Sequence, residues 1–186
     1  MDFIKGATQL ATVYYVCGNH EAWSGNYSQI KEELKEAGVI LLDDKALTLA
    51  RGEGKITLLG LADPDFYTSS YLQETEVKQI EEQLKKWESI DTFKLLLSHR
   101  PELFDIYVQN DIDLIFSGHA HGGQFRLPFI GGLVAPDQGI FPKYTSGEYQ
   151  KQNSTMFVSR GLGNSIIPIR IFNRPEIVVV VLKNKE

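Results

Sequence analysis

Apolar runs of strand length alternate along this chain with segments of helical periodicity, an alternation typical of a layered α/β domain. The best-defined helix is predicted where apolar residues recur at spacings of three and four among charged ones, at Val77, Ile80, Leu84 and Trp87. The run Phe93–Leu97 is almost uniformly apolar and predicts a strand that is buried on both faces. The expected fold class is therefore α/β.

The same patterns predict the remaining elements. Strands are expected at residues 12–16, 39–42, 46–49, 56–61, 114–116, 155–159 and 177–182. A helix is expected at residues 26–37, where Gly38 supplies a stop signal, and a short helix after Pro101, whose missing N–H does no harm in a first turn. Residues 118–153 are rich in glycine and proline and too long for a simple connection, which favours a functional segment.

Composition limits the classes of protein to which the chain can belong. With 186 residues, 42% hydrophobic and 23% charged, residues 1–186 are expected to form one domain with a core of its own. The formal net charge of −5 provides no electrostatic footprint for a nucleic-acid backbone, so no nucleic-acid partner is expected. The single cysteine, Cys17, excludes an internal disulfide framework, and its position at a strand end predicts a packing role over a reactive thiol.

Location is predicted only from what the chain contains. The first residues lack the basic flank and apolar stretch of a signal peptide. The longest aliphatic run, residues 177–182, is far shorter than the roughly 20 residues that a membrane helix needs. Taken by itself, the sequence predicts a cytoplasmic protein.

All four histidines come directly after predicted strands: His20, His99, His119 and His121. Because ligands of open α/β sheets bind at the carboxyl ends of the strands, these loops can converge on one site. Imidazole together with amide and carboxylate oxygen suits manganese, iron or zinc, whereas the lack of a cysteine cluster argues against structural zinc. Glycines around the last two histidines allow a turn that directs them at two adjacent ions, and the alternative is a glycine-rich turn with two surface histidines.

Three segments in this order resemble the later signature motifs of calcineurin-like metallophosphoesterases: Gly18-Asn19-His20-Glu21, Ser98-His99-Arg100-Pro101 and Gly118-His119-Ala120-His121-Gly122-Gly123-Gln124. Residues 127–130, 139–144 and 159–164 also resemble the YkuE-like and YaeI-like branch of bacterial phosphohydrolases, so the resemblance covers nearly the whole chain. It implies a four-layer α/β/β/α sandwich and a hydrolase that acts on phosphoric esters.

The resemblance also implies roles for individual residues. Asn19, His99 and His119 match the ligands of one metal ion, and His121 matches a ligand of a second. His20 matches the histidine that protonates the leaving group. In such a dinuclear site, two divalent ions about 4 Å apart hold a hydroxide for in-line attack on phosphorus. The implied ions are manganese, iron or zinc.

Neighbouring polar residues receive less specific expectations. Glu21 is expected to support the site without being a ligand. Arg100 and Arg160 are each expected either to contact phosphate or to pair with a carboxylate.

Two earlier family motifs, an Asp-x-His and a Gly-Asp whose aspartate bridges both metals, have no counterpart before Gly18. Phe3, Ile4, Ala7 and Leu10 fall on one helical face, so the chain is expected to start near the helix that follows the second motif in the family. The chain is thus expected to be the C-terminal portion of a metallophosphoesterase domain, truncated and lacking its first strands.

Truncation has consequences for metal content, association and location. One metal ion or none is expected to be tightly held, because the bridging aspartate is missing and the nearest acidic substitutes, Asp63 and Asp65, come in the wrong chain order. The loss of strands would expose a sheet edge, which favours self-association. Membrane association or export is compatible with a missing N-terminal segment.

Two hypotheses for function follow. The first is a metal-dependent phosphohydrolase that is impaired in this chain, and the alternative is a non-catalytic interaction module or inactive fragment that retains the fold. An apolar wall for a lipid-linked phosphate is one interpretation of the residues after the metal-binding motif, and ordinary capping of the core is the other. These residues are Phe125, Leu127, Phe129, Ile130, Leu133 and Val134.

Overall fold

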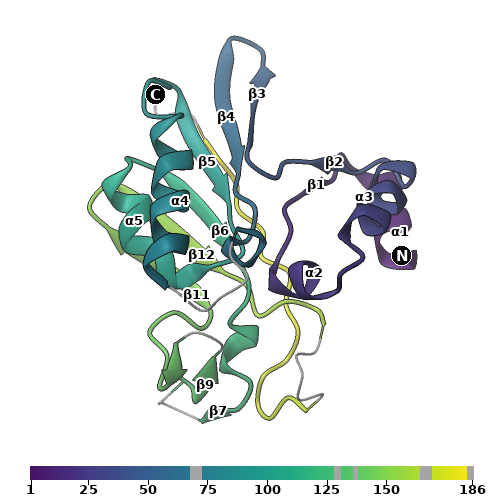
Figure 1. The fold of residues 1–186 in the computed structure, drawn as a ribbon, viewed down its shortest axis with the longest axis vertical. Helices are drawn as coiled ribbons and strands as arrows, with labels where there is room; N and C mark the ends of the chain where they lie inside the picture. The colour runs from purple at the N-terminus through teal and green to yellow at the C-terminus, as the bar shows by residue number, and fades with distance from the viewer. Residues whose placement is uncertain (68–72, 128–130, 136–137, 164–168, 184–186) are drawn as a thin grey trace.

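The computed structural model describes residues 1–67, 73–127, 131–135, 138–163 and 169–183 (Figure 1). Its centre is a six-stranded mixed sheet in the order β11-β12-β6-β5-β4-β3. The inner strands run parallel, and they are β4 (Gly54–Gly60), β5 (Phe93–Leu97), β6 (Leu114–Ser117) and β12 (Ser154–Val158). Antiparallel strands form the edges, β3 (Lys45–Arg51) beside β4 and β11 (Gly147–Lys151) beside β12. The α/β prediction is confirmed.

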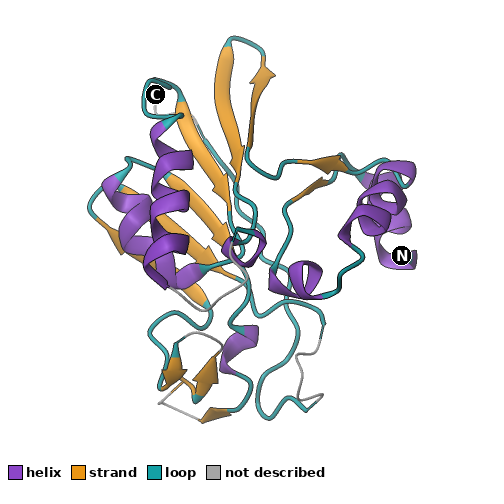
Figure 2. Ribbon diagram, in the orientation of Figure 1, coloured by secondary structure: helices purple, strands orange, loops and turns teal. Residues whose placement is uncertain are grey.

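Helices α4 (Gln73–Lys85) and α5 (Phe104–Gln109) cover one face of this sheet (Figure 2). On that face the four parallel strands contribute a row of directly paired, fully buried side chains: Leu59, Leu96, Ile115 and Met156. The helices add Ile80, Leu84, Phe104 and Tyr107 to the same cluster. Since full burial of one such side chain contributes about 1.5–3 kcal/mol, this layer supplies a large part of the driving force for folding.

A smaller unit carries the first 43 residues on the other side of the sheet (Figure 1). In it, β1 (Tyr14–Tyr15) pairs in parallel with β2 (Ile40–Leu41). The helices of this unit are α1 (Asp2–Leu10), α2 (Asn19–Trp23) and α3 (Tyr27–Glu36).

Cys17 joins this unit to the central sheet. Its N–H donates to Asp43 Oδ1 at 3.0 Å, and its Sγ accepts from the N–H of Asp63 at 3.4 Å, just beyond the carboxyl end of β4. The cysteine is fully buried, and burial raises the pKa of its thiol to about 12. A thiol with that pKa stays protonated near neutral pH, which confirms the packing interpretation of Cys17.

Short elements complete the described part of the chain. Two small hairpins follow the metal-binding motif, β7 (Arg126–Leu127) with β8 (Gly131–Gly132) and β9 (Val134–Ala135) with β10 (Gly139–Ile140). The single-turn helices are η1 (Pro64–Phe66), η2 (Pro101–Leu103) and η3 (His121–Gly123). In the ranges that the structure describes, no helix combines the length and apolar character needed to cross a bilayer.

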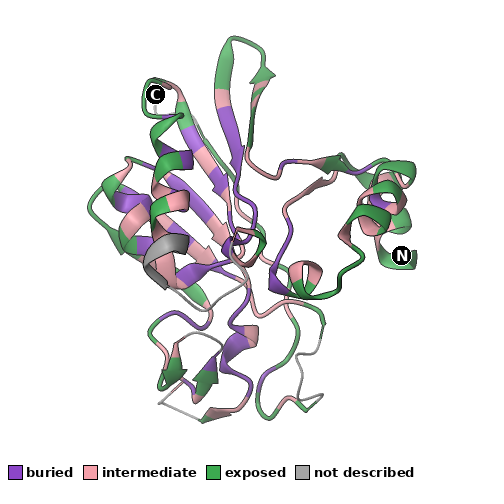
Figure 3. Ribbon diagram, in the orientation of Figure 1, coloured by how far each residue is buried: buried purple, intermediate pink, exposed green. Residues whose placement is uncertain are grey.

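Two predicted features of the strands are wrong. β5 is not buried on both faces, since Phe93 is 40% exposed and Leu95 and Leu97 are half-buried. The reason is that helices cover one face of the sheet, whereas the other face is less completely covered (Figure 3). Residues 177–182 form no strand, although half-buried and exposed side chains alternate from Ile177 to Val181 as they would in one. No described strand lies in register with this segment to supply a hydrogen-bonded ladder.

Candidate metal centre

Asn19 begins the short helix α2 and is 2% exposed. The carboxylate of Glu21 accepts a hydrogen bond from the N–H of Gly18 at 2.7 Å, which closes the first turn of α2. Glu21 thereby fixes the backbone that carries Asn19. Sequence patterns missed α2, because five residues are too few to show helical periodicity.

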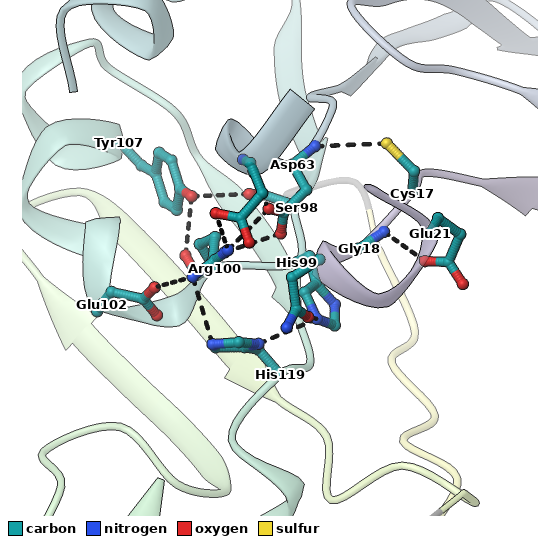
Figure 4. Close-up of polar contacts among 12 residues, drawn as sticks. Cys17, Gly18, Glu21, Asp63, Ser98, His99, Arg100, Glu102, Tyr107 and His119 are labelled. Atoms are coloured by element: carbon teal, nitrogen blue, oxygen red, sulfur yellow. Dashed lines mark hydrogen bonds and ion pairs between the residues drawn. The ribbon is translucent and has the colours of Figure 1, made fainter. Parts of the chain in front are cut away.

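His99 follows β5, and its ring points toward that of His119 (Figure 4). Nε2 lies 3.0 Å from Oδ1 of Asn19 and 3.1 Å from Nδ1 of His119. The two imidazole rings are 4.8 Å apart between centroids and 67° from coplanar. Side chains from three separate segments of the chain therefore meet at one point.

These three atoms fit one divalent cation. Each of them can present a lone pair, and an imidazole–carboxamide set suits manganese, iron or zinc. Two ligand atoms that lie about 2.1 Å from the same ion and about 90° apart are about 3 Å from each other. This matches the distances from His99 Nε2 to Asn19 Oδ1 and to His119 Nδ1. Among the described residues, no three His, Cys, Asp or Glu side chains gather as a metal-binding group, so the candidate set consists of two imidazoles and one carboxamide.

The electrostatic environment keeps His99 in the form that binds metal. Burial lowers the pKa of His99 well below its usual value, and the positive potentials of His119 and Arg100 lower it further. His99 is therefore neutral near pH 7 and does not have to lose a proton before it can coordinate a cation.

The other two predicted site histidines lie outside this three-atom cluster. His121 is half-buried. Its pKa is lowered first by burial and then by Arg170 and His119. His20 is exposed, and its ring lies 5.3 Å from the ring of Trp23. Both histidines are near enough to His99 to lower its pKa.

Arg100 resolves the alternatives that its sequence position left open. Its side chain is only 6% exposed, and its Nε and Nη2 donate to both carboxylate oxygens of Asp63 at 2.8 Å. Nη2 also lies 2.8 Å from Asp65, and Nη1 lies 3.5 Å from Glu102. Arg100 therefore pairs with carboxylates, and the same pairing directs Asp63 and Asp65 to the guanidinium instead of to a metal.

Arg160 also pairs with a carboxylate, since its Nε lies 3.3 Å from Glu176. Two of these carboxylate partners were missed at the sequence level because they are distant along the chain: Asp63 is 37 residues from Arg100, and Glu176 is 16 residues from Arg160.

Gly18 lies so close to His99 that a side chain would displace the ring. A Cβ at this position would lie 2.9 Å from three atoms of the imidazole. We expect Gly18→Ala to weaken Co²⁺ binding about 10-fold or more, because misplaced supporting groups typically cost 10–100-fold in metal affinity. A titration followed by visible absorption measures this. Gly6→Ala is the matched control, since nothing lies within 4 Å of its Cβ position, and an equal effect in both variants would contradict the expectation.

Gly123 allows the loop that carries the last two histidines to pack against β8. Its φ is +76°, and a Cβ there would lie 2.4 Å from Cα of Gly132. Because Gly132 Cα is a backbone atom, the clash could be relieved only by a shift of the backbone. We expect Gly123→Ala to lower the free energy of unfolding by about 2–4 kcal/mol, from left-handed strain and overpacking together. Urea denaturation measures the change. Gly25→Ala has similar strain at φ +66° but open space around Cβ, so it should lose about 1 kcal/mol, and equal losses would refute the clash.

Comparison with known proteins finds relatives that match most of the chain. The chain is 31% identical to the uncharacterized metallophosphoesterase YkuE of Bacillus subtilis, over 91% of this chain and 55% of YkuE. It is 26% identical to phosphodiesterase YaeI of Escherichia coli, over 97% of this chain and 62% of YaeI. It is also 30% identical to a transmembrane protein with a metallophosphoesterase domain from Danio rerio, over 91% of this chain and 38% of that protein.

No protein-family model matches the chain, and no solved structure matches it. The chain spans a little more than half the length of YkuE and YaeI. Several curated metallophosphoesterases match about nine tenths of the chain, and the motif residues that carry the resemblance include the three side chains that meet beside β5. Over about nine tenths of its length, the chain is therefore similar to metallophosphoesterases.

Proposed function

We propose that this chain is the metal-binding part of a metal-dependent phosphohydrolase, in which Asn19, His99 and His119 hold one divalent cation. The observation that carries the proposal is the approach of His99 Nε2 to within 3.0 Å of Asn19 Oδ1 and 3.1 Å of His119 Nδ1. When bound, manganese, iron or zinc would supply Lewis acidity toward a phosphoryl oxygen and toward water. The neutral state of His99 supports this role, because a protonated imidazole cannot coordinate.

We assign His20 the donation of a proton to the leaving oxygen, and His121 the binding of a second cation. His20 directly follows the buried Asn19 but is itself exposed, so its ring can face a bound ester. His121 is half-buried, and its pKa is lowered first by burial and then by Arg170 and His119, which favours the neutral imidazole.

We further propose that activity is impaired in this chain because the second cation lacks its bridging carboxylate. Asp63 is engaged by Arg100, and it therefore does not replace that ligand. A metal titration of the purified chain is expected to saturate at one weakly held ion. Two tightly held ions per chain would contradict this part of the proposal.

Residues 1–186 are proposed to form one domain whose second sheet face is covered by further strands in a four-layer α/β/β/α sandwich. A mainly apolar cavity of about 270 Å³ lies on that face, and its lining includes Leu97, Phe116, Phe157 and Val178. Self-association is proposed to use an exposed sheet edge, such as that of β3. Sedimentation velocity of the chain at several concentrations tests this, and a purely monomeric chain would argue against it.

The substrate is proposed to be a phosphate ester, as the name of the relative phosphodiesterase YaeI suggests, and more specifically a lipid-linked ester. Leu127 and Val134 are 41% and 43% exposed near the site, which supports an apolar wall. Phe129 and Ile130 lie outside the described residues. An active form that hydrolyses water-soluble esters faster than lipid-linked ones would contradict the lipid preference.

Hydrolysis of bis(p-nitrophenyl) phosphate in the presence of Mn²⁺ tests the proposed activity. A form extended to the length of the relatives is expected to turn over this diester, and the present chain is expected to be much slower. If the extended form binds metal but never hydrolyses an ester, the alternative of a non-catalytic interaction module is favoured.

A further inference from the structure

The loop that carries His99 is hydrogen-bonded to one buried hydroxyl group, that of Tyr107. Tyr107 on α5 is fully buried, and its Oη donates a hydrogen bond to the carbonyl oxygen of Arg100 at 2.8 Å. The same Oη lies 2.7 Å from Oγ of Ser98. Because the single hydroxyl hydrogen of Tyr107 is used toward Arg100, the Ser98 hydroxyl must donate to Tyr107. The two residues on either side of His99 are thus fastened to the same atom.

We propose that Tyr107 is a positioning residue for His99, a role that rests on the proposed metal site. The ring of His99 is limited on its other side by Gly18, whose Cβ position is only 2.9 Å from the ring. The N–H of Ser98 also donates to the carbonyl of Phe116 at 3.1 Å and ties the loop to β6. Backbone, hydroxyl and glycine contacts together leave His99 Nε2 facing Asn19 and His119.

The burial of Tyr107 keeps its hydroxyl available as a hydrogen-bond donor. Burial raises the pKa of Tyr107 above its usual value, so the hydroxyl keeps its proton near neutral pH. Its ring belongs to the main hydrophobic cluster, which fixes the position of the hydroxyl relative to the sheet. Without the hydroxyl, Arg100 O and Ser98 Oγ would each lose a buried partner, and the loop would relax toward other partners.

Tyr107→Phe tests the proposal, because it removes the hydroxyl and keeps the ring. Tyr149→Phe is the matched control, since Tyr149 Oη also accepts one bond, from Thr145 N at 3.1 Å, and donates one, to Ser146 O at 3.2 Å. Both variants lose two hydrogen bonds, so urea denaturation should show similar shifts in midpoint. Only Tyr107→Phe is expected to change the geometry around His99.

The first readout is NMR of the imidazole carbons in the metal-free chain, which contains four histidines. We expect the ring signals of His99 to shift or broaden in Tyr107→Phe and to stay unchanged in Tyr149→Phe. If Tyr107→Phe does not fold, Ser98→Ala is used, since it removes one of the two contacts. His99 signals that stay as in the unsubstituted chain, in a folded variant, would overturn the proposal.

The second readout is Co²⁺ affinity, which is expected to fall about 10-fold or more in Tyr107→Phe and less than about 2-fold in Tyr149→Phe. Equal losses in the two variants would also overturn the proposal, because they would indicate a general effect on stability. A chain that binds no Co²⁺ but shows the NMR change would contradict the proposed metal site and support the positioning role of Tyr107.

Discussion

Replacing Arg100 by methionine is expected to lower the free energy of unfolding by about 3–5 kcal/mol, the usual cost of removing one partner of a buried ion pair. The guanidinium is 6% exposed and the Asp63 side chain is fully buried. Without Arg100, Asp63 would remain as a buried carboxylate that has lost two hydrogen bonds of 2.8 Å. Urea denaturation of the two proteins measures the difference.

Arg160→Met is the control for this experiment. Arg160 and Glu176 are 30% and 29% exposed, and they are 3.3 Å apart. An ion pair with that much access to water contributes about 0–1 kcal/mol, so the control should change stability only slightly. Similar losses of unfolding free energy in Arg100→Met and Arg160→Met would contradict the expectation that the buried ion pair contributes more to stability than the partly exposed one.

Substitution of His20 by alanine is expected to lower kcat by about 10²- to 10⁴-fold in an active form of this protein, with metal content unchanged. The loss of kcat is expected because the variant lacks the proposed proton donor. Metal content should stay unchanged because His20 is exposed and contributes no atom to the cluster of Asn19, His99 and His119. Steady-state hydrolysis of a phosphodiester and metal analysis of the same samples measure the two quantities.

His20→Phe is a useful companion variant, because it keeps an aromatic ring next to Trp23, whose ring is 5.3 Å away, and removes only the titratable group. It should lose as much activity as His20→Ala. Loss of bound metal together with activity would mean that His20 is a ligand and not the proton donor.

Sequence patterns were most informative where side-chain periodicity reflects one covered face. The row of Leu59, Leu96, Ile115 and Met156 lies in segments that were predicted as strands, and all four residues are fully buried. The strands were less well predicted where pairing depends on a neighbour. Residues 177–182 have the composition of a strand, but β-structure also needs backbone partners, which composition does not reveal.

The candidate site was predicted in part. The motif order identified Asn19, His99 and His119, whose polar atoms meet in the structure. The supporting contacts could not be predicted, because Asp63 and Arg100 form their pair only after two loops have folded together. For the same reason, the two bonds of Tyr107 around His99 carry no signal in the linear sequence.

A titration of the metal-free chain with Co²⁺, followed by visible absorption, tests the central claim most directly. We predict one bound ion per chain, with absorption bands that disappear in both His99→Ala and His119→Ala while each variant remains folded. If the chain binds no cobalt, or if it binds equally well after both histidines are replaced, the proposed metal centre is wrong.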